Sequence, residues 1–209
     1  MAKTENPPFE RGKTFYDGGT IDSNNLGGGQ LIGRLFDFED IDLSSTSQGA
    51  KAMRTNHPVR CMAVRNTSAG VLYAKRLVKL KKTAGRYLVE EVDGYGTVAA
   101  DGPVFPVDEY VPTAGVPVND IFYIVVEGPA LTLTGLVGDA TNVISVGDHL
   151  VCLTAATSGA TTSGRIGPQD LSGSTTPLGN NIQNRVGLAM SAKTTANTNA
   201  DLLVYVGRW

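Results

Sequence analysis

The chain has 209 residues, with 18 Lys and Arg against 20 Asp and Glu, a net charge of −2 and 25 glycines. This balance excludes a globally basic nucleic-acid-binding protein. No stretch approaches the roughly 18 consecutive apolar residues that a transmembrane helix needs. The many glycines disfavour a helical bundle, whereas the abundant Thr, Val and Asn favour strands and turns. We therefore predict an all-β fold: a small β-barrel or sandwich with a long extended N-terminal arm and long loops.

Residues 1 to about 57 differ from the rest of the chain and are predicted to form the extended N-terminal arm. Glycines at 18–19 and 27–29 interrupt any regular element, and the apolar residues are too sparse for the segment to fold alone. Its large apolar residues are typical of interface anchors. The predicted anchors are Phe9, Phe15, Tyr16, Leu35, Phe36 and Phe38. We interpret the arm as docking on another surface; the alternative is a disordered leader.

From residue 58 onward the pattern changes to β-strands, and we take 58–209 as one β-rich, barrel-like domain. Short apolar runs predict strands over 59–64, 71–80 and 86–92. The four prolines between residues 102 and 117 exclude a central strand or a helix there. That stretch is predicted to be an ordered loop.

The last hundred residues are predicted to form a compact β module. Strands are expected over 121–128, 130–134, 143–148 leading into 150–153, 186–190 and 202–206. Strands and turns at a spacing of about ten residues suit a small barrel or sandwich. Residues 154–184 are rich in Thr, Ser, Gly and Asn, and they indicate a long surface loop or an insertion that contacts a neighbour.

Charge is segregated along the chain. Ten basic residues and no acidic one lie between Lys51 and Arg86, whereas from residue 101 onward four basic residues face nine acidic ones, a balance of −5. The predicted basic docking face consists of Arg60, Arg65, Lys75, Arg76, Lys79, Lys81 and Lys82. Such a face can bind an acidic partner, associate head to tail with another copy, or remain a solvated surface. We expect no nucleic acid as partner, because few aromatics interleave with these charges and no recognition motif accompanies them.

The cysteines and histidines limit the chemistry that the chain can perform. Cys61 and Cys152 each lie in an apolar run and are predicted to be buried thiols, although a disulfide between them stays open. Neither His57 nor His149 has metal-ligand spacing, and no HExxH, CxxC, GxSxG or phosphate-binding loop occurs. We therefore expect no enzymatic activity, no cofactor and no metal site.

Three short phrases stand out in the C-terminal half. They are Val-Gly-Asp-His-Leu-Val at 146–151, Arg-Val-Gly-Leu-Ala-Met at 185–190 and Asp-Leu-Leu-Val-Tyr-Val at 201–206, with a Gly/Thr-rich stretch at 154–164. This arrangement resembles the capsid decoration (cement) proteins of tailed bacteriophages, in which such paired phrases close a small β-barrel. The physical roles fit: Gly147-Asp148 provides a tight turn, and Gly187 allows close backbone approach.

The resemblance implies a structural virion protein that binds the outside of the assembled major capsid protein lattice and stabilises the shell. It implies no enzymatic activity, no cofactor and no membrane partner, and it implies homo-oligomers, with trimers favoured. The protein would be made in the host cytoplasm and located on the outer capsid surface of the virion. Many weak contacts by the arm would clamp neighbouring subunits together. The alternative is a β-rich adhesion or glycan-binding module of a virion tail or fibre, which the 7% aromatic content does not favour.

Overall fold

Every regular element that the computed structural model describes is a β-strand, which confirms the all-β class. The described residues are 11, 13–16, 31–42, 53–83, 86–96, 103–134, 143–152, 164–169, 185–194 and 200–207. The strands are β1 (Phe15–Tyr16), β2 (Leu35–Ile41), β3 (Met53–Asn66), β4 (Leu77–Thr83), β5 (Arg86–Tyr95), β6 (Val104–Pro106), β7 (Asp120–Leu133), β8 (His149–Cys152), β9 (Ile166–Pro168), β10 (Arg185–Ala189) and β11 (Asp201–Val206).

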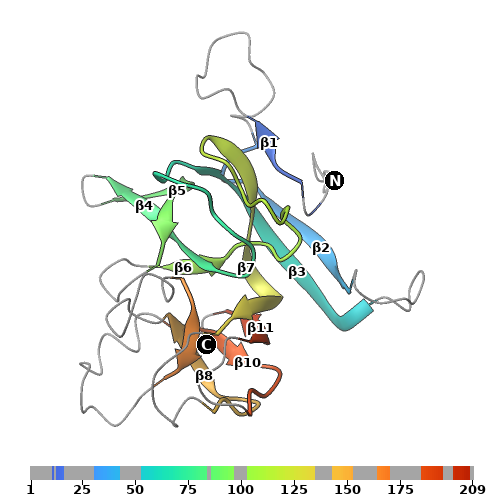
Figure 1. The fold of residues 1–209 in the computed structure, drawn as a ribbon. Helices are drawn as coiled ribbons and strands as arrows, with labels where there is room; N and C mark the ends of the chain where they lie inside the picture. The colour runs from blue at the N-terminus through green and yellow to red at the C-terminus, as the bar shows by residue number, and fades with distance from the viewer. Residues whose placement is uncertain are drawn as a thin grey trace, which may run out of the picture.

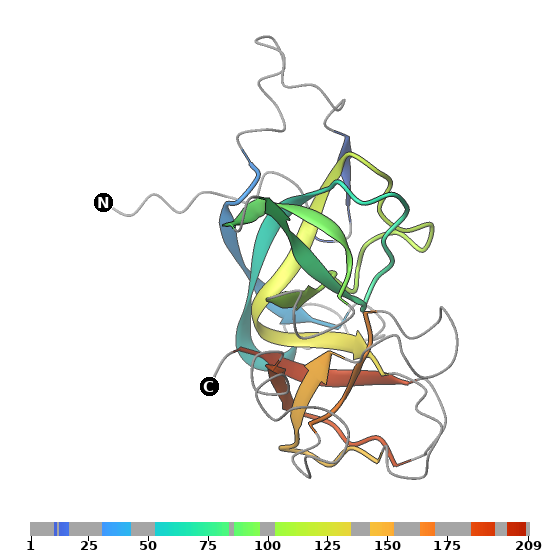
Figure 2. The same ribbon diagram turned by 90° about the vertical axis from the view of Figure 1, so that its left-hand side faces the viewer.

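These strands form one mixed sheet. Its hydrogen-bonded path runs β6-β4-β5-β3-β7-β11-β10-β8-β9, with β1 added to β7 and β2 added to β3. Strands β3 and β5 run parallel, and the other ladders are antiparallel. The long strand β7 leads from the upper part of the molecule, with β1 to β6, into the lower part, with β8, β10 and β11 (Figures 1 and 2).

Strand β7 has apolar side chains buried on both of its faces. Ile121, Tyr123 and Val125 belong to one apolar cluster, whereas Phe122 and Ile124 belong to a second one. Successive side chains of a strand point to opposite faces of the sheet. A strand that is covered on both faces reads as a continuous apolar run, which is why this segment has the strongest strand signal in the chain.

No ladder between described residues closes the predicted barrel. The two ends of the path each return to β7 through a single isolated bridge, Val107↔Ile124 beside β6 and Thr134↔Ile166 beside β9. The sheet therefore curls onto β7 from both ends, and each curl encloses apolar side chains. Both end strands are short and finish in proline, Pro106 and Pro168, which suits strand edges because proline donates no hydrogen bond.

The structure modifies several predicted boundaries. Of the strand expected over 71–80, only residues 77–80 are strand, in β4, and of the described residues in the strand expected over 143–148 and 150–153, only 149–152 form one, β8. The strands expected over 121–128 and 130–134 are one strand, β7, whose Gly128 has a positive φ of 99°. The expected loop between residues 102 and 117 contains the short strand β6. Of the long loop predicted over 154–184, the structure describes residues 164–169, which include β9.

The described parts of the predicted arm lie on the sheet of their own chain. Strand β1 pairs with β7 at Phe15↔Ile121, and β2 pairs with β3 at six positions. The boundary predicted at residue 57 falls inside β3. Strand β2 also contributes Phe36, which is 6% exposed, to an apolar core.

Cys61 and Cys152 are buried and not joined by a disulfide, which confirms the predicted thiols. Burial raises the pKa of Cys61 well above its usual value, so this thiol stays protonated and unreactive at neutral pH. In the described part of the chain, no helix is long and apolar enough to cross a membrane.

Candidate functional site

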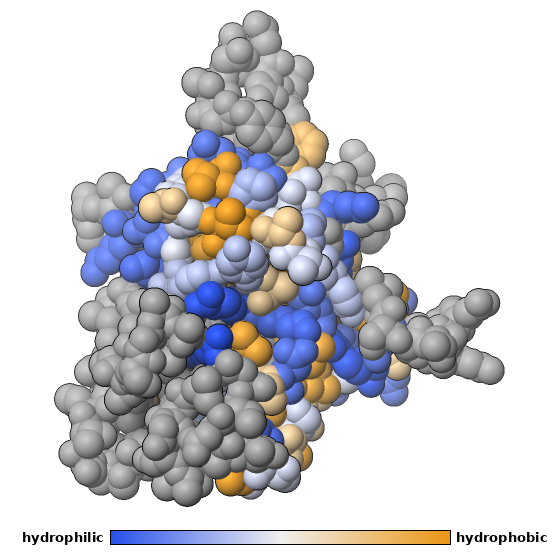
Figure 3. All heavy atoms as spheres, in the orientation of Figure 1, coloured by the Kyte–Doolittle hydropathy of each residue, from blue (hydrophilic) through white to orange (hydrophobic). Residues whose placement is uncertain are grey.

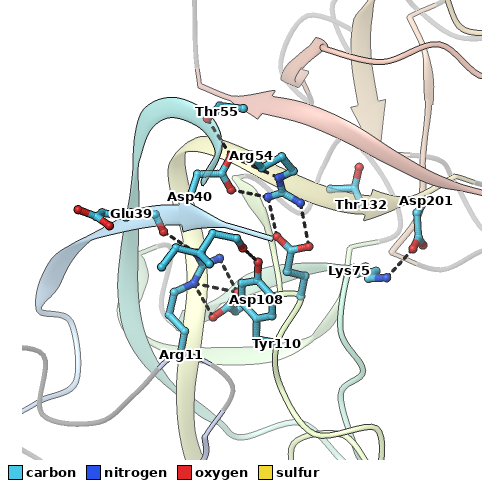
Figure 4. Close-up of polar contacts among 12 residues, drawn as sticks. Arg11, Glu39, Asp40, Arg54, Thr55, Lys75, Asp108, Tyr110, Thr132 and Asp201 are labelled. Atoms are coloured by element: carbon cyan, nitrogen blue, oxygen red, sulfur yellow. Dashed lines mark hydrogen bonds and ion pairs between the residues drawn. The ribbon is translucent and has the colours of Figure 1, made fainter. Parts of the chain in front are cut away.

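Five charged side chains from distant segments meet in what we call the ion-pair cluster (Figure 4). Its members are Arg11 before β1, Asp40 on β2, Arg54 on β3, and Asp108 and Glu109 in the loop between β6 and β7. Asp40 and Asp108 are fully buried. Two positive charges therefore face three negative charges, away from bulk water.

Arg54 binds two carboxylates at once. Its Nη2 lies 2.5 Å from Asp40 Oδ1 and 2.7 Å from Glu109 Oε1, and its Nε and Nη1 complete bidentate contacts at 3.3 and 3.1 Å. Thr55 donates a further hydrogen bond of 2.8 Å to Asp40. The planar guanidinium suits this two-sided geometry better than a lysine ammonium would. Arg54 thus joins β2 and β3 to the loop that precedes β7.

Arg11 binds Asp108 in the same bidentate way. Its Nη2 lies 2.7 Å and its Nε 3.1 Å from the Asp108 oxygens, and its Nη1 donates to the carbonyl oxygen of Glu39 at 3.4 Å. The guanidinium also lies 4.7 Å from the centre of the Tyr110 ring. The Arg11 side chain is only 9% exposed. These contacts fasten the segment before β1 to the body of the chain.

The electrostatics of the cluster reflect burial opposed by pairing. Burial alone would lower the pKa values of Arg11 and Arg54, but their carboxylate partners outweigh it and raise both above the usual value. Burial raises the pKa of Glu109, and Arg54 limits that rise. The cluster therefore holds its arginines charged at all physiological pH values, and Glu109 ionises against the cost of its burial.

Tyr110 adds a neutral hydrogen bond beside the cluster. Its hydroxyl donates to the carbonyl oxygen of Ile41 at the end of β2, and burial raises the pKa of Tyr110 to about 12.

We expect Tyr110→Phe to lower the free energy of unfolding by about 1 kcal/mol, as one hydrogen bond is lost. Urea unfolding with an unchanged slope will measure this; a loss above about 3 kcal/mol would mean that the ring, retained in the variant, has been displaced.

The predicted apolar anchors fall into three groups. Phe9 and the side chain of Tyr16 lie outside the described part of the chain. Phe15 and Leu35 are 38% and 56% exposed. Phe36 and Phe38 pack edge-on against Tyr123, with ring centres 5.8 and 5.2 Å apart. The last two rings therefore anchor β2 to its own chain.

Exposed apolar side chains are few on the face shown in Figure 3, where they form small groups among polar ones. The larger exposed apolar residues of the described chain are Phe15, Leu35, Met53, Val71, Tyr73, Val118, Val143 and Val146. Small groups of this kind are ordinary on a soluble surface. Any contact with a partner through them needs several weak contributions together.

The predicted basic docking face is largely engaged within the chain. Lys75 binds Asp201 at 2.5 Å and Lys81 binds Glu91 at 2.7 Å. The guanidinium of Arg76 stacks on a tyrosine, 3.7 Å from the centre of the Tyr95 ring. Arg65 and Lys79 are half-buried, and Lys82 is exposed. A docking role for these seven residues stays a prediction.

Arg60 is an exposed member of this set that has a carboxylate on either side. It lies on β3 between Asp37 of β2 and Glu127 of β7, at 2.8 and 3.1 Å. All three side chains are about half exposed. The three strands are adjacent in the sheet, so this row of charges crosses β2, β3 and β7.

The ion-pair cluster was missed by sequence reasoning, and the reason is sequence distance. Arg11 and Asp108 are separated by 97 residues, and Arg54 and Glu109 by 55. The one available signal was the charge segregation, because basic residues before position 87 bind acidic residues after position 100 in several pairs. The segregated charges are therefore complementary inside one chain.

No three or more His, Cys, Asp or Glu side chains in the described segments are placed to hold a metal ion.

Comparison with known proteins gives one finding. No protein-family model matches the chain, and no curated protein matches it. Among solved structures, the chain is similar to the head fiber gp8.5 N base in bacteriophage phi29. The two have a TM-score of 0.38 and 16% sequence identity, over 71% of this chain and 93% of that chain. At this TM-score the similarity transfers no function.

Proposed function

We propose that this chain is a structural, non-catalytic protein of a tailed-bacteriophage virion, which binds the outer face of the assembled capsid lattice and stabilises the shell. The observation that carries the proposal is the arrangement of three phrases. Residues 146–151, 185–190 and 201–206, on which the resemblance to decoration proteins depends, lie together in the structure. They contain β8, β10 and β11, and β10 pairs with both of the others.

The glycines in these phrases have the roles that the resemblance requires. Gly147 has a φ of 90° in a turn where Ser145 and Asp148 hydrogen bond to each other. A Cβ atom on Gly187 would lie 2.0 Å from the carbonyl oxygen of Tyr205. The expected close backbone approach at Gly187 is confirmed. The phrases therefore specify one packed unit rather than scattered short matches.

Shell stabilisation follows from mass action. A protein that binds assembled subunits and not free ones shifts the equilibrium toward the shell. Many copies with modest contacts reach high overall affinity when neighbouring copies are close together. The exposed Phe15 and Leu35 and the predicted basic docking face are the proposed contacts with the major capsid protein. A homo-oligomer, a trimer in the first instance, would add valency.

The proposal is tested by binding to capsids. The full-length protein is mixed with purified expanded shells that lack it, and the pelleted copies are counted by mass spectrometry against the major capsid protein. We expect saturation at a fixed ratio comparable to the capsid subunit number. A handful of copies per particle, or copies only at a tail, would overturn the proposal and favour an adhesion module.

A matched pair of variants tests which surface is used. Leu35→Ser changes an apolar side chain that is 56% exposed on a predicted contact strand, and Val146→Ser changes one that is 67% exposed outside it. Both substitutions leave the core intact. We expect Leu35→Ser to weaken capsid binding and Val146→Ser to leave it unchanged; equal affinities would remove β2 from the contact.

A further inference from the structure

In a short N-terminal segment, residues 11–16, Arg11 and strand β1 contact the body of the chain. Arg11 binds Asp108 and the carbonyl oxygen of Glu39, and it lies over the Tyr110 ring. Strand β1 adds a two-residue ladder with β7. We call Asp108, Tyr110 and the Glu39 carbonyl the Asp108 site. The segment thus binds to the Asp108 site of its own chain.

The Asp108 site requires a positively charged partner. Asp108 is fully buried, and the Arg11 side chain that neutralises it is 9% exposed. A buried carboxylate without its partner is strongly unfavourable. Each Asp108 site therefore needs an arginine, and the Arg11 of a second copy offers the same side chain as the Arg11 of its own chain.

The connection to the rest of the chain is long enough to allow a choice. Fourteen residues, 17–30, separate β1 from the described residues before β2, and five of them are glycines. Fully extended, such a stretch spans about 50 Å, more than the roughly 30 Å diameter of a small domain. The same segment can therefore reach the Asp108 site of an adjacent copy.

We propose that residues 11–16 exchange between copies of this chain, so that the Arg11 of one copy fills the Asp108 site of the next. The Arg11 contacts and the β1–β7 ladder break for the exchange, and the same contacts form again in the neighbour, as in domain swapping. In dilute solution the Asp108 site binds the segment of its own chain, because the tether gives that segment an effective concentration of about millimolar. Where copies are held close together, as on a regular lattice, the segment of a neighbouring copy has a similar effective concentration. Its binding to the Asp108 site then links the two copies.

Charge reversal provides a test in which no chain can form the ion pair with itself. One variant carries Arg11→Glu, so its segment is repelled by its own Asp108. The other carries Asp108→Arg, so its site repels its own Arg11. Each variant alone lacks a matching pair, but a mixture regains both pairs when the segments cross between copies. We expect equimolar mixing to give 1:1 complexes by native mass spectrometry, at least tenfold more abundant than self-complexes of either variant.

The double variant Arg11→Glu with Asp108→Arg is the control, because it restores the match within one chain. If that double variant is folded and the mixture stays monomeric, the exchange does not occur. The readout is association of this chain with itself, so a negative capsid-binding result leaves it unaffected, and a negative exchange result leaves capsid binding unaffected.

A second test keeps the native ion pairs, in case the reversed charges prevent folding. Tyr16 and Asp120 are partners in the β1–β7 ladder, and cross-strand neighbours lie within the Cα range of a disulfide. One tagged copy carries Tyr16→Cys and another carries Asp120→Cys; they are mixed at about millimolar concentration and oxidised. We expect a disulfide between copies that joins positions 16 and 120. A double-cysteine variant, Tyr16→Cys with Asp120→Cys, shows whether this disulfide forms within one chain. If it forms there and no covalent pair appears in the mixture, the proposal is overturned.

Discussion

Arg54→Met is expected to lower the free energy of unfolding by about 3–5 kcal/mol, the usual loss when one partner of a buried ion pair is removed. Arg54 is 14% exposed and binds Asp40 and Glu109, which are 0% and 5% exposed. Methionine keeps most of the length and apolar volume of the side chain. The loss will therefore report two buried carboxylates without their cation, measured by urea unfolding with an unchanged slope.

The matched control is Arg60→Met on the same strand. Arg60 also binds two carboxylates, Asp37 and Glu127, but all three side chains are about half exposed. Exposed ion pairs contribute little because water and salt screen them. We expect Arg60→Met to be nearly neutral. If the two variants were equally destabilised, burial would not be the cause of the Arg54 effect.

The cost of Arg54→Met should shrink as the pH falls. Burial raises the pKa of Glu109 in the folded chain, so the folded state binds a proton at pH values where the unfolded state has already released it. Stability from this group is therefore present below the unfolded pKa and is lost as the pH rises through the folded pKa. Without Arg54, burial acts unopposed and extends that window upward. Comparison of both proteins at about pH 8 and pH 5 should show a smaller difference at pH 5; a constant difference would contradict this account.

The strands were predictable because their signals are local. The apolar run at 121–125 and the phrases at 185–190 and 201–206 are short apolar segments flanked by turn residues, and all three are strands. The same reasoning divided β7 at Gly128, because a glycine followed by Pro129 normally ends a strand. In the structure the chain bends there and continues, since β11 pairs with the residues on the far side.

The arm was predicted for a sound local reason that tertiary contacts partly override. Residues 1–57 are too poor in apolar residues to fold alone, yet Phe36 and Phe38 complete a core around Tyr123, a residue of β7. No sequence window contains both halves of that contact. The charged side chains follow the same logic, because the partner of Arg11 lies 97 residues away. Truncation at residue 45 would remove β2 and uncover this core, so point variants are the cleaner tests of binding.

Gly128 is a backbone position where substitution should be costly for two separate reasons. Its φ of 99° is in the region that side chains disfavour, and an added Cβ would lie 2.3 Å from the carbonyl oxygen of Pro58 and 3.2 Å from the Cα of Val59. Neither obstacle is a flexible side chain, so β3 and β7 must separate at this end of their ladder. The conformational strain costs about 1–2 kcal/mol, and overpacking adds about 1–3 kcal/mol.

Gly128→Ala is therefore expected to lower the free energy of unfolding by about 2–5 kcal/mol. Gly147→Ala is the matched control, because its φ of 90° is similar but no atom lies within 4 Å of the added Cβ. It carries the conformational strain alone, about 1–2 kcal/mol. Urea unfolding of both variants separates the two contributions, and the difference between them measures the contact between β3 and β7. Equal losses would show that β3 and β7 separate here at little cost, and that the loss in Gly128→Ala comes from the φ angle rather than from close packing.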